Sequence, residues 1–229
     1  TTATISNVSV KELGADWTFL GVDATNTISI ESGGARFNSV DANISLRQSI
    51  LDVGKHYKLT CDITETIGQI ALDVTTAGTT IPLNDGFNEL YFTANSTTFS
   101  IKRYISVSNV LLNNITVQEV GQDWTLTSGA SITALGAKIT HTPTAGQISQ
   151  ASVLELEKRY KLTYEITENI SGGLKTNSAV ITTMVTTVGT HTRYFEADDT
   201  TFIIARTSAV DNDVTITNIS VQEVGQDWT

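Results

Sequence analysis

The stretch His56-Tyr57-Lys58-Leu59-Thr60-Cys61-Asp62-Ile63-Thr64 alternates without a break between apolar and polar side chains. From Tyr57 to Ile63, the odd-numbered positions are apolar and the positions between them are polar. Such alternation predicts a β-strand that is buried on one face only. The pattern returns 103 residues further on, in Tyr160-Lys161-Leu162-Thr163-Tyr164-Glu165-Ile166-Thr167. The sequence therefore predicts the same strand twice, in a repeated β-domain, and it places Cys61 in the buried row.

A second repeated stretch shows where one repeat meets the next. The residues Val117-Gln118-Glu119-Val120-Gly121-Gln122-Asp123-Trp124-Thr125 recur unchanged at 221–229, and a looser copy occupies 10–18. The tryptophans of the three copies, Trp17, Trp124 and Trp228, are separated by 107 and 104 residues. This period is too long for a solenoid repeat and matches a small domain.

The repeat period predicts the domain boundaries. We expect the last strand of a preceding repeat at 1–14, complete repeats at 15–121 and 122–225, and the first residues of a further repeat at 226–229. The chain would then be an excerpt of a longer polypeptide. The alternative is a two-domain protein whose ends imitate the junction.

The composition indicates an all-β protein. The chain is rich in Thr, Val, Ile and Ser, and it contains only 2 Pro. β-Branched residues favour pleated sheets. Turn signals such as Gly33-Gly34, Asn84-Asp85-Gly86 and Gly172-Gly173 separate eight or nine short strands in each repeat. This pattern predicts tandem antiparallel β-sandwiches of the jelly-roll type.

The net charge and the small number of reactive side chains argue against several classes of function. The net charge is −10 and no basic cluster is present, so we expect neither nucleic-acid binding nor attraction to an anionic membrane. No apolar run is long enough to span a bilayer. The 3 His are not at corresponding positions, and no phosphate loop or nucleophile elbow is present. The sequence therefore leads us to expect no enzyme activity, no metal centre and no cofactor. A two-carboxylate glycosidase is the alternative that the many Asp and Glu residues leave open.

Calcium is the one ion that the sequence leaves open. Asp198-Asp199 and Asp211-Asn212-Asp213 are short acidic groups in expected turns. Calcium prefers clustered oxygen ligands. The first repeat has Asn95-Ser96 where the second has Asp198-Asp199. Simple solvation of these turns is the alternative.

Several matching segments resemble a known module. The first repeat offers Trp17, Leu46-Arg47-Gln48, Gly54-Lys55-His56-Tyr57-Lys58-Leu59-Thr60 and Asn114-Ile115-Thr116-Val117. The second offers Trp124, Ile148-Ser149-Gln150, Lys158-Arg159-Tyr160-Lys161-Leu162-Thr163 and Asn218-Ile219-Ser220-Val221, and it lacks the glycine before its lysine. This set resembles the carbohydrate-binding-module-like jelly rolls of phage virion appendages and secreted bacterial glycoside hydrolases. The resemblance covers nearly the whole chain and implies sugar binding through aromatic rings and amides on a sheet face.

The resemblance suggests two groups of candidate site residues. Candidate carbohydrate ligands are the paired amides and tyrosines, Gln48, Gln150, Tyr91 and Tyr194. For the tyrosines, core packing is the alternative. The residues expected at the junctions between repeats are Gly14, Trp17, Gly121, Trp124, Gly225 and Trp228. A tryptophan that closes one end of a domain core is favoured over a sugar platform.

Two functions fit these features. The first is a structural or adhesive repeat protein of a virion fibre or another extracellular appendage, acting as a spacer and glycan-contacting module. Its partners would be neighbouring repeats, a cell-surface glycan and, in a fibre, other copies of the chain. The second is an array of carbohydrate-binding modules that anchors a secreted enzyme to a polysaccharide.

Overall fold

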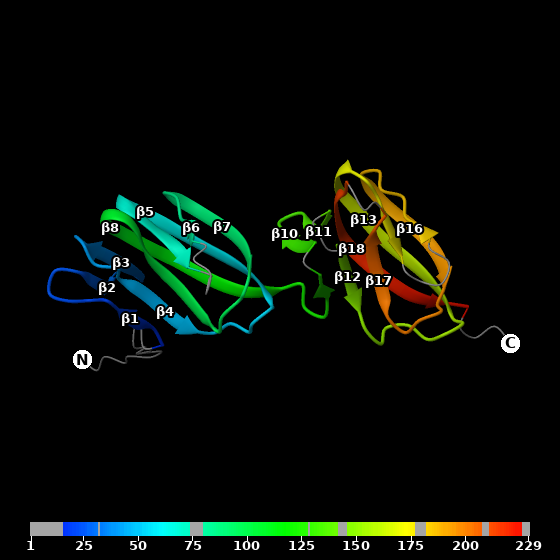
Figure 1. Ribbon diagram of the computed structural model, residues 1–229, viewed down its shortest axis with the longest axis horizontal. Coiled ribbons are helices and arrows are strands. Elements are labelled where there is room, and N and C mark those ends of the chain that lie inside the picture. The colour runs from blue at the N-terminus through cyan, green and yellow to red at the C-terminus, as the bar shows by residue number, and fades with distance from the viewer. Residues whose placement is uncertain are drawn as a thin grey trace, which may run out of the picture. The chain divides into compact units, whose positions relative to one another are not determined.

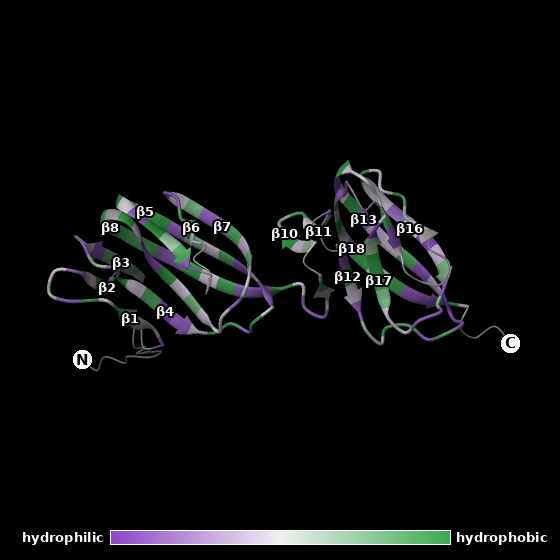
Figure 2. Ribbon diagram, viewed as in Figure 1, coloured by the Kyte–Doolittle hydropathy of each residue, from purple (hydrophilic) through white to green (hydrophobic). Residues whose placement is uncertain are grey.

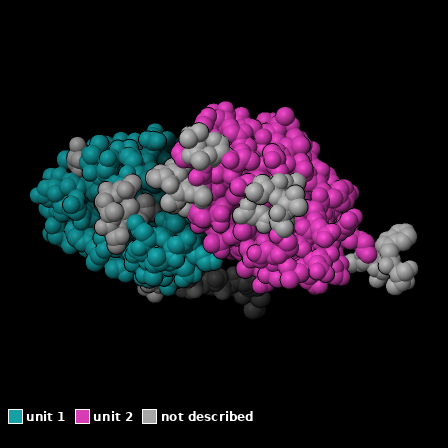
Figure 3. Space-filling model, turned by 45° about the vertical axis from the view of Figure 1, so that its right-hand side comes forward, with its two compact units in different colours: residues 1–119 teal, residues 120–229 magenta. Residues whose placement is uncertain are grey.

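The computed structural model describes residues 16–31, 33–73, 80–127, 129–141, 146–176, 182–207 and 211–225. It divides the chain into two compact units, residues 1–119 and 120–229 (Figure 3). Every strand pairing recorded in the described residues is antiparallel, and these residues contain no helix, so the all-β prediction is confirmed. Accordingly, no described segment is a helix long and apolar enough to cross a membrane.

The first unit is one sheet that folds over its own core. The strand order is β1-β4-β8-β3-β2, and β5 pairs with β6, β7 and β8. The long strands β5 and β8 each contribute to both layers (Figure 1). The strands are β1 (Thr18–Leu20), β2 (Thr27–Glu31), β3 (Gly34–Ser39), β4 (Ser45–Ser49), β5 (His56–Asp73), β6 (Thr80–Pro82), β7 (Gly86–Thr93) and β8 (Thr98–Val120).

The second unit is built from two separate five-stranded sheets. One has the order β10-β11-β18-β13-β16 and the other β15-β14-β17-β12-β9. The strands are β9 (Thr125–Leu126), β10 (Ala130–Thr133), β11 (Gly136–Thr140), β12 (Gln147–Gln150), β13 (Arg159–Ser171), β14 (Leu174–Thr176), β15 (Thr182–Thr183), β16 (Gly189–Glu196), β17 (Phe202–Arg206) and β18 (Asp213–Val224).

The strand registers of the two units correspond. Gln48 lies opposite Phe99 in the first unit, and Gln150 lies opposite Phe202 in the second. Strand β5 corresponds to β13 and β14 together, and β8 corresponds to β17 and β18 together. Because β5 and β8 run on where the second unit breaks its strands, the two layers of the first unit form a single sheet.

Each unit has its own hydrophobic core, built from the alternating rows that the sequence predicts. The green and purple bands along the strands show this alternation (Figure 2). Leu59, Cys61 and Ile63 are at most 1% exposed, and the same holds for Leu162, Tyr164 and Ile166. The predicted strands 56–64 and 160–167 are therefore confirmed, within β5 and β13.

Each core contains a stacked aromatic pair at the corresponding place. Tyr57 stacks on Phe92 with ring centroids 5.8 Å apart, and Tyr160 stacks on Phe195 at 5.7 Å. The Tyr57 hydroxyl accepts a hydrogen bond from the Asp52 backbone N–H. Tyr160 repeats this contact in the second unit with the N–H of Glu155. The repeat is thus copied in its side-chain contacts as well as in its strand order.

Candidate functional site

A row of three solvent-facing side chains crosses one sheet of the second unit. Lys161 on β13 lies opposite Tyr194 on β16 and opposite Gln222 on β18. Their strand neighbours Tyr160 and Leu162 point into the core, and side chains alternate along a strand. The three therefore point outward, and Tyr194 is 66% exposed. We call the Tyr–Lys–Gln set the outer row.

The first unit carries the same outer row. Lys58 lies opposite Tyr91, and Gln118 stands 104 residues before Gln222, the offset that also relates Asn114 to Asn218. Here the lysine is engaged: its Nζ is 2.8 Å from Glu89 Oε2 and 5.6 Å from the Tyr91 ring centroid. The Tyr91 hydroxyl donates to Glu89 Oε1 at 3.1 Å.

The ion pair between Lys58 and Glu89 shifts the pKa of both residues. The hydrogen bond from Lys58 holds the pKa of Glu89 below its ordinary value. The same bond, with a smaller contribution from the Tyr91 hydroxyl, raises the pKa of Lys58. Both groups are solvated, and exposed ion pairs contribute little to folding stability. Their effect is to fix the charge pattern of the row.

Two further rows beside the outer row also match. Thr60 and Thr116 share a 2.6 Å hydrogen bond across β5 and β8. One row further, the Asn114 side-chain N–H donates to Asp62 at 2.8 Å, and that of Asn218 donates to Glu165 at 2.7 Å. Both asparagines have φ of 49°, a left-handed conformation that asparagine tolerates better than most residues. These rows of the outward sheet face are therefore alike in both units, with Thr163 opposite Ser220 where the first unit has Thr60 and Thr116.

The outward face of the other layer differs between the units. Arg47 pairs with Ser100 in the first unit, and the same register positions hold Ser149 and Ile203 in the second. Lys102 pairs with Ser45, whereas the second unit has Ala205 opposite Gln147. Ser45, Ser100 and Ala205 on this layer are buried despite their outward phase. The units thus share the tyrosine, lysine and glutamine of the outer row, whereas none of the four positions compared on this layer matches.

The structure separates the predicted carbohydrate ligands into two places. Tyr91 and Tyr194 face outward in the outer rows. Gln48 and Gln150 lie on β4 and β12, where both are half-buried and stand opposite a core phenylalanine. In the second unit, β12 and β16 belong to different sheets. The structure therefore does not bring Gln150 together with Tyr194, and the amides beside the tyrosines are Gln118 and Gln222.

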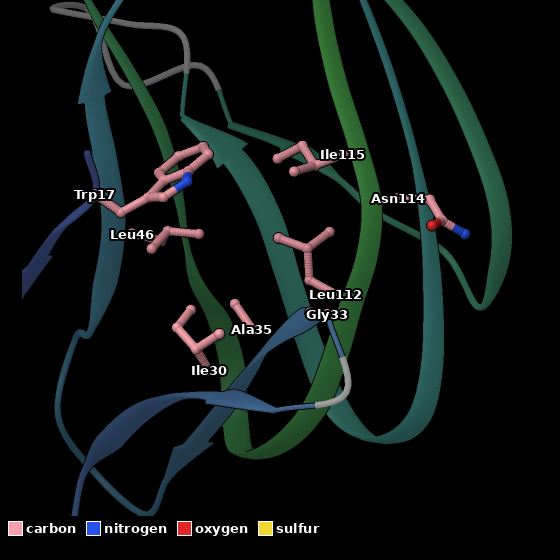
Figure 4. A pocket seen from close by; sticks show the side chains of 9 residues that line it. Trp17, Ile30, Gly33, Ala35, Leu46, Leu112, Asn114 and Ile115 are labelled. Atoms are coloured by element: carbon pink, nitrogen blue, oxygen red, sulfur yellow. The ribbon is translucent and has the colours of Figure 1, made fainter. Parts of the chain in front are cut away.

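A small apolar cavity lies beside Trp17 in the first unit (Figure 4). Its volume is about 120 Å³. The Trp17 ring meets Phe99 edge-on, with centroids 6.1 Å apart, and Leu112 faces the cavity from β8. The Asn114 side chain points away from its centre (Figure 4). The lining residues are Trp17, Ile30, Gly33, Gly34, Ala35, Leu46, Leu112, Asn114 and Ile115.

The second unit repeats the cavity at the matching place, with a volume of about 190 Å³. Trp124 meets Phe202 edge-on at 6.3 Å. Gly121 also lines this cavity, with φ of +68°, and a Cβ on it would lie 3.0 Å from the Ile132 side chain. Trp17 and Trp124 thus pack at matching places against the core of their own unit.

The other junction residues give less information. Gly225 follows β18 with φ of +84°, and a Cβ there would meet no atom within 4 Å. Gly14 and Trp228, together with the predicted segments 1–14 and 226–229, lie outside the described residues.

In the candidate calcium turn 211–213 each side chain has a protein partner, and in the turn 198–199 Asp199 accepts a hydrogen bond from the Thr201 N–H at 2.9 Å. Asp211 accepts from Ser171 at 2.6 Å, and Asp213 pairs with Lys138 at 2.9 Å. The buried Asn212 side chain donates to the Ile139 carbonyl and accepts from the Gly173 N–H. Among the described residues, no three His, Cys, Asp or Glu side chains gather closely enough to hold a metal ion.

Comparison with known proteins gives no family. No family model matches the chain, and no curated protein matches it. One similar solved structure is a Bacillus subtilis oxalate decarboxylase, at 10% identity over 97% of this chain and 81% of that chain, with a TM-score of 0.19. Another is the Momordica charantia 7S globulin, at 8% identity over 90% and 86%, with a TM-score of 0.17. A third, vicilin from Corylus avellana, has 8% identity over 90% and 87%, with a TM-score of 0.16.

The expectation that the chain is not an enzyme is wrong. It rested on the absence of catalytic motifs from the sequence. The solved structures that match the chain include several oxalate decarboxylases, so resemblance at this level does not exclude an enzyme. Because their TM-scores are 0.15 to 0.19, these matches assign no reaction to the chain.

Proposed function

We propose that each unit is a jelly-roll glycan-binding module, and that the tandem acts as an adhesive spacer in an extracellular or virion appendage. The observation that carries the proposal is the outer row, in which tyrosine, lysine and glutamine occupy the same outward positions in both units. The two five-stranded antiparallel sheets around one core in the second unit support the jelly-roll assignment.

The chemistry of the row suits a sugar. A tyrosine ring offers a flat apolar face that packs against sugar C–H groups, while its hydroxyl remains a hydrogen-bonding group. Lysine supplies donors only, and the glutamine amide both donates and accepts, so together they satisfy hydroxyl groups of either role. Thr163 and Ser220 extend this hydroxyl-binding surface along the next row.

The tandem arrangement supports an adhesive role. A single exposed tyrosine on an open sheet gives weak binding, because little of the ligand is enclosed. Two modules on one chain raise the overall affinity through effective concentration, without any new contact. A polymer that presents many copies of one sugar is the ligand that such a protein fits. The resemblance of the repeats to virion and secreted modules supports the location.

Affinity electrophoresis of the full chain through gels with embedded neutral and acidic polysaccharides tests this function. Removing one ring by Tyr91→Ala or Tyr194→Ala should weaken binding by about 5- to 30-fold, from about 1–2 kcal/mol of ring contact. The double variant should lose retardation.

Tyr104→Ala is the matched control. Tyr104 is 42% exposed but lies on the β8 segment of the other layer, where the second unit has Thr207. Its binding should equal that of the wild type. A double variant Tyr91→Ala/Tyr194→Ala that is retarded like the wild type, or a wild type that no polysaccharide retards, would refute the proposal.

A further inference from the structure

We infer that the two units differ in the charge of the glycan they bind: the outer row of the second unit takes acidic sugars that carry a carboxylate, and that of the first takes neutral ones. The inference rests on the proposed function. The units differ at several outward positions, among them His56 and Thr93 where the second unit has Arg159 and Glu196, and the inference comes from the one difference that decides whether the lysine of the row is paired. In the first unit Glu89 on β7 lies opposite Thr60 on β5. At the same register position of the second unit, Thr192 on β16 lies opposite Thr163 on β13.

In the first unit the cation of the row is already neutralised. Lys58 Nζ lies 2.8 Å from Glu89 Oε2, and Glu89 also accepts a hydrogen bond from the Tyr91 hydroxyl. A carboxylate on the ligand would have to displace Glu89 or lie beside it, and two like charges at short range repel. The uncharged hydroxyls of a neutral sugar meet no such obstacle.

In the second unit the lysine is not paired. Lys161 has no ion pair with a described residue, because Thr192 stands where Glu89 would be. The carboxylates nearest to the row have other partners. Glu165 accepts from Asn218, and Glu196 pairs with Arg159 at 3.5 Å. An incoming carboxylate would therefore form a new charge-assisted hydrogen bond, the stronger kind.

A hollow beside the row has room for the sugar. It has a volume of about 350 Å³ and is lined by Arg159, Tyr194, Phe195, Glu196 and Val224. A ligand stacked on the Tyr194 ring would thus have Lys161 across the strand on one side and the Arg159–Glu196 ion pair at the rim. The tyrosine ring and the neighbouring Thr163 and Ser220 hydroxyls favour a polyhydroxylated ligand over an acidic peptide.

The net charge of −10 does not oppose this assignment. At physiological ionic strength the screening length is about 8 Å, so charges spread over the chain act weakly on a bound carboxylate. A lysine in hydrogen-bond contact with the ligand is inside that length. The local cation therefore decides the preference.

The test compares polygalacturonate with its methyl ester, two polymers with the same sugar backbone and different charge. Both are titrated into the full chain. Tyr91→Ala silences the first unit so that the second is measured, and Tyr194→Ala does the reverse. The second unit should bind polygalacturonate about tenfold or more tightly than the ester, since a hydrogen bond to a charged group is worth about 1.5–3 kcal/mol. The first unit should show no such preference.

Reciprocal swaps at the position that pairs or frees the lysine make the test specific. Thr192→Glu should remove the preference of the second unit, and Glu89→Thr should create one in the first. Thr192→Gln, which adds length without charge, should keep the preference. A thermal melt of each variant shows whether it folds.

The outcomes separate the two proposals. If the second unit binds both polymers equally, or Thr192→Glu leaves its preference unchanged, the charge assignment falls and the glycan-binding function stands. If polyglutamate binds as tightly as polygalacturonate, the row is a general anion site and the assignment to sugars falls. If neither polymer nor any neutral polysaccharide binds either unit, both proposals fall.

Discussion

The Tyr164 hydroxyl provides a sharp test of how the edge strand that carries Tyr194 is held. Tyr164 lies on β13 with its ring fully buried. Its hydroxyl donates to the Val185 carbonyl and accepts from the Val185 N–H, both at 3.0 Å. Val185 precedes β16, so these two bonds fasten the connection that leads into the edge strand. The matching residue of the first unit is Cys61, which has no such reach.

The change Tyr164→Phe keeps the ring in the core and removes both hydrogen bonds. A net hydrogen bond is worth about 1 kcal/mol, so the loss should be about 2 kcal/mol. The second unit spans residues 120–229. At about 2.1 cal/mol/K per residue, a unit of that size has an unfolding entropy of about 0.23 kcal/mol/K. The expected fall in its melting temperature is therefore about 9 °C.

Differential scanning calorimetry of the full chain measures this change. The transition of the second unit should move down, and that of the first should stay in place. Tyr194→Phe is the control, because the Tyr194 side chain is largely exposed and no described residue bonds its hydroxyl. A loss below about 0.5 kcal/mol, the lower end for one hydrogen bond, would show that Val185 is not held in this way.

Three further predictions concern the junction, the acid response and the thiol. Gly121→Val should destabilise the second unit by about 1–2 kcal/mol, because φ of +68° is unfavourable for other residues and the Cβ would crowd Ile132. Denaturant melts measure the loss, with Gly225→Val as the control at a position where a Cβ meets no atom. If Gly121 also sets the angle between neighbouring repeats, the small-angle scattering profile should change, and an unchanged profile would contradict that role. Burial, with the Lys55 charge, lowers the pKa of His56, so the unfolded state binds its proton more readily. The first unit should therefore lose stability as the pH falls below the ordinary histidine pKa. His56→Gln should reduce that loss in urea melts between pH 7 and 5, and the same dependence of stability on pH in the variant would contradict this. Burial raises the pKa of the Cys61 thiol to about 11, so native protein at pH 8 should react with a thiol reagent no faster than it unfolds, and prompt labelling would be inconsistent with the buried position.

The sequence predicts the strands well because burial dictates their pattern. Each apolar residue in the alternating row from Tyr57 to Ile63 faces a core, and its copy does the same in the second unit. The same alternation placed Lys58 and Thr60 on the outer side. The phase of Gln48 already pointed toward the core, since Leu46 two residues earlier is buried.

The sequence could not show which outward residues are neighbours. Tyr194, Lys161 and Gln222 come from three strands, and only the strand register places them in one row. Alternation gives the face of a residue but not its partner across the sheet. The available signal was the identity of outward residues between repeats: the repeated strings contain Lys58 with Lys161 and Gln118 with Gln222, and Tyr91 recurs as Tyr194 at the same offset of 103 residues as the lysines.

The cavities beside the tryptophans were also beyond reach from the sequence. Their walls bring together residues far apart in the sequence, such as Trp17 with Leu112 and Trp124 with Ile216, and the exact ends of the short strands beside them decide which residues line them. Strand ends are the least certain feature of a sequence pattern.

The most direct test of the shared outer row is an amide chemical-shift map of the full chain. The ligand is a partly methyl-esterified oligogalacturonide, which carries both neutral and acidic residues. We predict that the largest shifts cluster at Lys58, Tyr91 and Gln118 in the first unit and at Lys161, Tyr194 and Gln222 in the second. Shifts that gather instead around Gln48 and Gln150 on the other layer, or no shifts at all, would contradict the account.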